Sequence, residues 1–299
     1  MIAFRRFRKV FGRHVAVADL TLDVRPGETL ALLGPNGSGK TTTLKAAAGL
    51  IQPTSGDVLL GEPGVPARVP SARNLVSFLP QRVAFPDALT GREVVEFYRA
   101  LRGTPERRTD EVLRFASLNG AAARAVGTYS GGMVQRLGLA VAVLPDAPVF
   151  LLDEPTAALD PDGLAAFYGV VERHVAEGRT VLFTSHQLGD VERLADRFAV
   201  LVAGRLVAVL THRELHDRLA QRGVMRVRLA AQPSTLLAEM RRLAPGARFE
   251  RDEVVIPGPP AVRPAALDII RQTGTEIAGL TAEEGRLDTF YRELIGESG

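Results

Sequence analysis

Short apolar runs alternate with helical patterns from the start of the chain. Ile2–Val10 and Val15–Val24 have the composition of strands, and Glu28–Leu33 is a continuous apolar run that ends at a glycine-rich turn. Such a run is typical of a parallel strand that is buried on both faces of its sheet. The next segment, Thr41–Ala48, is rich in Ala, Leu and Lys and predicts a helix. The order strand, glycine turn, helix is therefore expected here.

Two later apolar runs, Val149–Leu152 and Thr180–Thr184, each follow a helical segment and predict further buried strands. Between about residues 86 and 145 the pattern is helical, without convincing strands. This alternation predicts an α/β fold with a mainly parallel sheet and an inserted helical subdomain at about 86–145. We place this first domain at residues 1–210.

The composition changes after Leu210. Three strands and two helices are expected in the remainder, at Val224–Ala230, Phe249–Ile256, Thr275–Leu280, 233–243 and 264–273. The sequence LDTFYRELIG lies near the end of the chain. We predict a small α+β accessory domain at residues 211–299, and its role stays open between regulation or dimerisation and simple scaffolding.

Composition limits the class of protein. The chain has 299 residues, no Cys, 46% apolar residues and 24% charged residues, which excludes fibrous, disulfide-stapled and wholly disordered proteins. The 37 Lys and Arg exceed the 34 Asp and Glu by only three charges, so the net charge is not that of a nucleic-acid binder. We expect no nucleic-acid partner.

Targeting signals are not evident. The basic N-terminal residues are not followed by the apolar segment of a signal peptide. The most apolar stretches, including Leu137–Leu144 and Phe198–Ala203, are well short of the roughly 20 residues that cross a bilayer. Because the chain has no cysteine, no disulfide argues against a cytoplasmic location. Any association with a membrane is expected to require a partner.

The strongest local motif matches the phosphate-loop pattern G-x-x-x-x-G-K-[ST]. It comprises Gly34, Pro35, Asn36, Gly37, Ser38, Gly39, Lys40 and Thr41. The motif lies between a predicted strand and a predicted helix, where its glycines let backbone N–H groups curl around phosphate oxygens. Lys40 is expected to reach the β- and γ-phosphates, and Thr41 is expected to ligate Mg²⁺. A simple glycine turn is the weaker alternative.

Two adjacent acids, Asp153 and Glu154, follow the predicted strand Val149–Leu152. Neighbouring residues of a strand point in opposite directions, so the two carboxylates should differ in role. Asp153 is suited to the inner or outer coordination shell of Mg²⁺, whereas Glu154 can orient and deprotonate an attacking water. These acids would only solvate the strand end if no phosphate loop were present.

A second anion-binding helix start is expected where Ser130, Gly131 and Gly132 precede an apolar helix. The chain therefore carries two phosphate-binding helix ends. Both could face one nucleotide only if the chain pairs with a second copy or a relative.

Residues 1 to about 210 resemble the ATPase subunit of an ABC transporter. Six motifs occur in the order of that family: GPNGSGKTT with Thr42 as its last residue, Gln81 in FLPQR, YSGGM, VFLLDE, AALD with Asp160, and His186 in TSHQ. The resemblance implies a P-loop NTPase fold of ABC ATPase type, with ATP and Mg²⁺ as cofactors. It also implies two such domains that enclose two ATP molecules, each held by the phosphate loop of one and the signature of the other.

The resemblance assigns further roles residue by residue. Gln81 would contact Mg²⁺ and the attacking water, although an isolated loop amide is usually only exposed. His186 would contact the γ-phosphate, although a lone His after a strand is usually structural. Asp160 would lie at the dimer interface, and Ser130 with Gly132 would touch the γ-phosphate across it. Phe11 would stack on adenine, or it would pack in the core.

The same resemblance implies the partners. An integral-membrane permease subunit and a second ATPase subunit, as a homodimer, are expected, which places the chain on the cytoplasmic face of the plasma membrane as a peripheral subunit. The YSGGM signature and the C-terminal region are similar to those of export-type ATPases. The stretch 79–103 and the C-terminal tail are similar to those of the copper-associated ATPase that helps to mature nitrous oxide reductase. The alternatives are an ABC ATPase acting on ribosomes or DNA without a permease, and a catalytically silent nucleotide-binding module.

Overall fold

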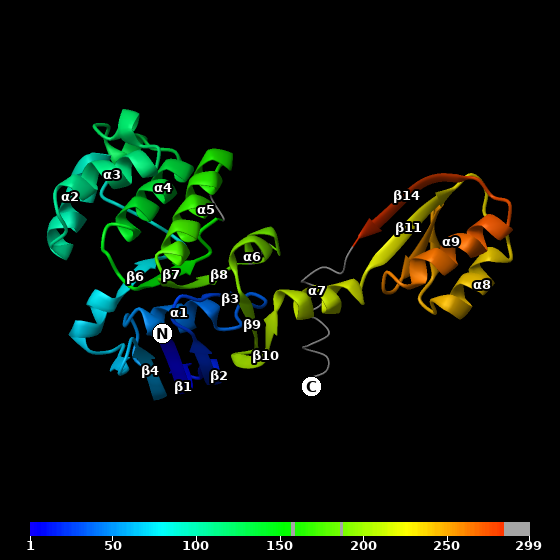
Figure 1. Cartoon of the computed structure of the whole chain (residues 1–299), viewed down its shortest axis with the longest axis horizontal. Helices are drawn as coiled ribbons and strands as arrows, with labels where there is room; N and C mark the ends of the chain where they lie inside the picture. Colours follow the sequence, from blue (N-terminus) through cyan, green and yellow to red (C-terminus); the bar gives the residue numbers. More distant parts are fainter. Residues whose placement is uncertain (157–158, 186–187, 284–299) are drawn as a thin grey trace. The chain divides into compact units, whose positions relative to one another are not determined.

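The computed structural model describes residues 1–156, 159–185 and 188–283. The chain divides into two units, Met1–Leu210 and Thr211–Gly299 (Figure 1). Each helix in the described ranges is too short or too polar to span a bilayer.

The first unit is built on a ten-stranded sheet with the order β5-β4-β1-β2-β10-β9-β3-β8-β7-β6. Its strands are β1 (Ile2–Phe11), β2 (His14–Val24), β3 (Thr29–Leu33), β4 (Ser55–Leu60), β5 (Val65–Pro66), β6 (Val76–Leu79), β7 (Val149–Asp153), β8 (Thr180–Thr184), β9 (Arg197–Val202) and β10 (Arg205–Thr211). One half, β5-β4-β1-β2, is antiparallel, whereas β9, β3, β8, β7 and β6 are parallel.

The parallel strands β3, β7 and β8 are buried along their whole lengths, as their continuous apolar runs require. Their carboxyl ends meet at one edge of the sheet, where Asp153 of β7 lies opposite Thr184 of β8. This edge therefore brings together polar residues that are far apart in the sequence.

Helices cover both faces of this half of the sheet. Those of the first unit are α1 (Lys40–Ala47), α2 (Gly91–Arg102), α3 (Arg107–Phe115), α4 (Gly131–Ala142), α5 (Pro161–Ala176) and α6 (Leu188–Leu194), with short 3₁₀ turns at Pro70–Leu75, Asn119–Ala121 and Val126–Thr128. Figure 1 shows α4 and α5 on one side of β6, β7 and β8 and α1 on the other. The segment that was predicted to be helical contains α2, α3 and α4.

Local sequence explains how the helical segment begins and ends. The hydroxyl of Thr90 accepts from the backbone N–H of Glu93, and the Glu93 carboxylate accepts from that of Thr90, which makes a capping box at the start of α2. Gly103, with a φ of 63°, ends the helix in the left-handed conformation. The start and end of α2 are thus encoded by the residues at its two termini.

The second unit begins with α7 (His212–Ala220) and continues as a four-stranded antiparallel sheet with the order β12-β13-β11-β14. Its elements are β11 (Val224–Leu229), α8 (Leu236–Leu243), β12 (Arg248–Glu250), β13 (Glu253–Pro257), α9 (Val262–Gln272) and β14 (Ile277–Glu283). The order β-α-β-β-α-β is that of a ferredoxin-like unit. Its core includes Met225, Val227, Met240 and Ile270, contributed by β11, α8 and α9.

The predicted fold class, an α/β fold with a helical insertion and a small α+β unit, is confirmed. The single strand expected at Phe249–Ile256 is wrong, because β12 and β13 form a hairpin there. Arg251 and Asp252 make the turn, with Arg251 at a φ of 56°, and Glu250 pairs with Glu253 across it. The charged residues RDE within the apolar pattern mark this reversal.

Candidate functional site

The loop Gly34–Gly39 joins β3 to α1 in a conformation that depends on glycine. Gly34 and Gly39 have φ values of 147° and 100°. A Cβ atom added at Gly34 would lie 2.1 Å from the carbonyl oxygen of Leu201. A Cβ atom added at Gly39 would lie 2.6 Å from the carbonyl oxygen of Ala16. Neither position has room for a side chain, so the loop is held tightly against β9 and β2.

Helix α1 begins without a side-chain cap, because Gly39 occupies the N-cap position. The first N–H groups of an uncapped helix are available to an anion, and the helix dipole favours negative charge there. The adjacent hydroxyl of Ser38 is buried and has no hydrogen-bond partner among the described residues. The start of this helix therefore offers several hydrogen-bond donors to a bound anion.

The ammonium group of Lys40 is held over the loop. Its Nζ donates to the carbonyl oxygens of Gly34 (2.8 Å) and Pro35 (3.1 Å). Burial lowers the pKa of Lys40, and the negative charges of Glu154 and Asp153 oppose that effect. A buried cation next to unpaired donors makes the loop a strong site for phosphate oxygens.

The carboxylate of Asp153 is buried at the end of β7 and receives two hydroxyl groups on one oxygen. Thr41 Oγ1 lies 3.1 Å and Thr184 Oγ1 2.9 Å from Asp153 Oδ1. Burial raises the pKa of Asp153, and these two hydrogen bonds oppose the increase. A carboxylate and a hydroxyl at this separation are hard oxygen ligands of the kind that Mg²⁺ prefers, so the residues present fit this ion.

Glu154 follows in a left-handed backbone conformation with a φ of 46°. Its N–H donates to Thr184 Oγ1 at 2.8 Å, and its Oε2 accepts from Gln81 Nε2, also at 2.8 Å. Asp153 is almost completely buried, whereas Glu154 is half-buried and lines the cavity described below. The turn at Glu154 thus places the two adjacent carboxylates in different surroundings.

These groups border one cavity of about 400 Å³. It is lined by residues 36–42 together with His14, Ala16, Gln81 and Glu154. The structure therefore brings the phosphate loop, Gln81 and Glu154 together, and Asp153 accepts a hydrogen bond from Thr41 of that loop region.

Sequence reasoning missed His14, Ala16 and Thr184. His14 pairs with Phe11 in the β1–β2 hairpin, so its proximity to Phe11 was the available signal. Thr184 is at the carboxyl end of a buried strand, and that position was a signal for a site residue. The contact of Thr184 with Asp153 depends on the order of the strands in the sheet, with β8 next to β7.

Phe11 does not line this cavity. Its side chain is 48% exposed, and Lys9 Nζ lies 4.8 Å from the centre of its ring. Packing in the core, the alternative for Phe11, is therefore wrong. Its ring remains available on the surface near His14.

Other predicted residues lie away from the cavity in this single chain. Ser130 caps α4 by accepting from the N–H of Met133 (3.3 Å), and Gly131 and Gly132 form the first turn of that helix. Asp160 caps α5 by accepting from the N–H of Gly163 (2.8 Å), with Arg136 NH2 at 3.9 Å. His186 lies outside the described residues.

Comparisons with known proteins agree with this geometry. The model of the ABC transporter family matches residues 17–157. The chain is 39% identical over 211 residues to the ABC transporter ATP-binding protein YxlF of Bacillus subtilis, covering 69% of each chain. It is 37% identical over 222 residues to the Nod factor export ATP-binding protein I of Cupriavidus metallidurans, covering 73% of each chain.

A solved structure shares the fold of the first unit. It is a dimeric ATP-binding cassette in a post-hydrolysis state with bound ADP and phosphate, with a TM-score of 0.65 and 25% identity, covering 71% of this chain and 98% of that one. The relatives described here give no support to the copper-linked interpretation, and they do not favour the alternative of an ATPase acting on ribosomes or DNA.

Proposed function

The chain belongs to the ATP-binding proteins of ABC transporters and is an ATPase, and from this premise we propose that it powers export of a substrate through a separate membrane permease. The observation that carries the ATP-hydrolysing part of the proposal is the convergence of Thr41, Asp153, Gln81 and Glu154 beside the phosphate loop. The direction of transport is suggested by the Nod factor export relative.

The phosphate groups of ATP would be bound by the backbone N–H groups of the loop and of the first turn of α1. Lys40 would exchange its hydrogen bonds with Gly34 and Pro35 for β- and γ-phosphate oxygens. The hydroxyl of Ser38, which has no hydrogen-bond partner in the described part of the chain, is a further donor at the same place. The exposed ring of Phe11 would stack on adenine.

Thr41, Asp153 and Gln81 would hold Mg²⁺, with Asp153 kept in place by Thr184. When bound, this ion neutralises charge on the β- and γ-phosphate oxygens. Because Asp153 is buried and shares its oxygen with two hydroxyl groups, its position is set before a nucleotide arrives.

Glu154 would orient the attacking water and accept its proton. Gln81 donates to Glu154 Oε2 and so holds this carboxylate at the edge of the cavity. The role of His186 at the γ-phosphate stays a prediction.

We also propose that two copies enclose the nucleotides. Ser130 does not line the cavity of its own chain, so Ser130 and the backbone N–H groups of Gly131 and Gly132 would act on the nucleotide of a second copy. The dimeric cassette with ADP and phosphate is consistent with this arrangement. The permease would then place the chain at the cytoplasmic face of the plasma membrane.

Two substitutions test the assignment. We expect Glu154→Gln to retain MgATP binding, to lose hydrolysis by a factor of at least about 10², and to elute as a dimer in size-exclusion chromatography with MgATP. We expect Lys40→Ala to weaken MgATP binding at least about tenfold and to stay monomeric. Glu239→Gln, which removes an exposed carboxylate from α8, is the control and should behave as wild type.

Unchanged hydrolysis in Glu154→Gln, or a monomer that is saturated with MgATP, would refute the assigned site. The permease is tested separately by purifying the tagged chain from detergent-extracted membranes of its source cells. Co-purification of a multi-span membrane protein supports export through a permease. An active ATPase recovered without such a protein contradicts it.

A further inference from the structure

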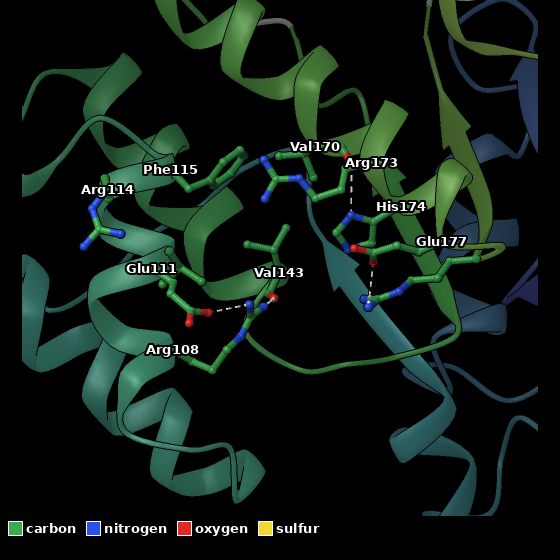
Figure 2. A pocket seen from close by; sticks show the side chains of 11 residues that line it. Arg108, Glu111, Arg114, Phe115, Val143, Val170, Arg173, His174 and Glu177 are labelled. Atoms are coloured by element: carbon green, nitrogen blue, oxygen red, sulfur yellow. Dashed lines mark hydrogen bonds and ion pairs between the residues drawn. The ribbon is translucent and has the colours of Figure 1, made fainter.

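A second cavity, of about 360 Å³, lies in the first unit and shares no lining residue with the nucleotide cavity. Its walls come from α3, from Val143 at the end of α4, from α5 and from the loop that leads to β8 (Figure 2). A volume of this size matches that of pockets that bind small molecules.

The walls of this cavity are partly apolar. Val112 and Phe115 come from α3, Val143 caps α4, and Val170 comes from α5. Val112, Val143 and Val170 are buried, and Phe115 is half-buried. These side chains offer a surface to a branched or aromatic group of a ligand.

Two arginines of the cavity are already neutralised. Arg108 donates to Glu111 Oε2 at 2.9 Å and to the carbonyl oxygen of Val143 at 2.7 Å. Arg179 pairs with Glu177 Oε2 at 2.9 Å and with Asp146. Figure 2 shows the contacts of Arg108 with Glu111 and with Val143. The two carboxylates that line the cavity are thus each engaged by a cation.

Two further arginines, Arg114 and Arg173, have no such partner. Their guanidinium groups make no hydrogen bond or ion pair with the residues that the structure describes. In Figure 2 Arg173 extends from α5 towards Phe115, while Arg114 lies at the outer edge. The lining therefore carries two positive charges beyond those balanced by Glu111 and Glu177.

His174 adds a polar atom without adding charge. Its Nδ1 lies 3.0 Å from the carbonyl oxygen of Val170, and its ring stacks on Phe150 with the ring centres 4.8 Å apart. An Nδ1–H that donates to this carbonyl leaves Nε2 as an acceptor in the neutral ring. Burial lowers the pKa of His174, and the charges of Arg179 and Arg108 contribute to this decrease.

We propose that this cavity is a binding site for a small organic anion with an aromatic or branched apolar body. The carboxylate, sulfonate or phosphate of such a ligand would pair with Arg173, since the planar guanidinium group binds such groups through two parallel hydrogen bonds, while Arg114 would add positive charge at the outer edge of the cavity. Its apolar body would lie against Phe115, Val112 and Val170. The bound molecule would touch both α3 and α5, and so would connect the helical segment to the sheet core.

The proposal does not depend on the proposed transport function. The probe is 1-anilinonaphthalene-8-sulfonate, whose fluorescence is titrated with the full chain in saturating MgADP, so that the phosphate loop is occupied. Displacement is then measured with 2-naphthoate and with its uncharged counterpart 2-naphthalenemethanol. We expect one saturable site, displaced by 2-naphthoate at a concentration at least about tenfold lower than by the alcohol.

The double variant Arg114→Gln/Arg173→Gln should weaken binding of the probe at least about tenfold. The matched control Arg107→Gln/Arg242→Gln removes the same charge from exposed positions outside the cavity and should bind as wild type. Both variants should keep the circular dichroism spectrum and the ATPase rate of the wild type. Equal affinity in both variants, equal displacement by the two naphthalene compounds, or no saturable binding would overturn the proposal.

Discussion

The hydroxyl of Thr184 connects both acids of the nucleotide site to the neighbouring strand. Thr184 Oγ1 donates to Asp153 Oδ1 and accepts from the N–H of Glu154, and the side chain is fully buried. Thr184→Val keeps the shape of the side chain and removes both hydrogen bonds. It therefore isolates the energetic value of this hydroxyl.

The expected loss follows from the two contacts. A hydrogen bond to a charged group contributes about 1.5–3 kcal/mol, and a buried N–H left without an acceptor costs about 1–3 kcal/mol. Since one hydroxyl serves both groups, we expect the free energy of unfolding to fall by about 3 kcal/mol. In a unit of this size that corresponds to a decrease in Tm of roughly 6–12 °C.

Catalysis should change as well. Removal of the Thr184 hydroxyl withdraws one of the two hydrogen bonds that hold down the pKa of Asp153, and it frees the backbone turn at Glu154. A misplacement of catalytic groups by about 1 Å costs roughly 10²-fold in rate. We expect kcat for ATP hydrolysis to fall by about this factor.

Thr29→Val is the matched control. Thr29 is a fully buried Thr in the adjacent strand β3, and its Oγ1 has no hydrogen-bond partner among the described residues. Replacing an unsatisfied hydroxyl by a methyl group is neutral or stabilising. Thermal unfolding and steady-state ATPase assays on both variants test the reasoning. If Thr184→Val matches Thr29→Val in Tm and in kcat, the assigned role of the Thr184 hydroxyl is wrong.

Three further outcomes are expected. Burial raises the pKa of the Asp153 carboxyl group, so the folded state binds a proton there more readily than the unfolded state does. The stability of the nucleotide-free protein therefore falls as pH rises from the unfolded-state pKa through the folded-state pKa of this group. Asp153→Asn should raise Tm at pH 7 in EDTA while abolishing hydrolysis, and a lower Tm would contradict this. Gly39→Ala places a Cβ atom 2.6 Å from the carbonyl oxygen of Ala16, in a backbone conformation with a φ of 100° that strains a side chain. We expect loss of MgATP binding and a lower Tm by calorimetry. Wild-type values of both would show that no such strain is present. Gln81→Ala removes the donor to Glu154 Oε2 and should lower kcat about tenfold at unchanged ATP affinity; an unchanged kcat would remove Gln81 from the site.

Prediction from sequence worked best where one element contains its own signals. The buried strands β3, β7 and β8 and helix α1 were expected within one or two residues, because a continuous apolar run or a helical pattern is read over neighbouring positions. It failed at Phe249–Ile256, where a two-residue turn interrupts an otherwise strand-like pattern. The charged residues at Arg251 and Asp252 are a signal for this turn, but only the pairing of Glu250 with Glu253 shows that the two strands form a hairpin.

The sequence by itself determined that the chain carries a phosphate loop, because Gly34 to Thr41 are consecutive and their backbone forms the site. Tertiary structure alone decided that Thr184 holds Asp153, that Gln81 meets Glu154, and that Arg173 and Phe115 line one cavity. Each of these contacts joins residues from different elements, and strand order and helix packing bring them together. Local preferences of the backbone are set by neighbouring residues, whereas such contacts form only when apolar faces far apart in the chain are buried against one another.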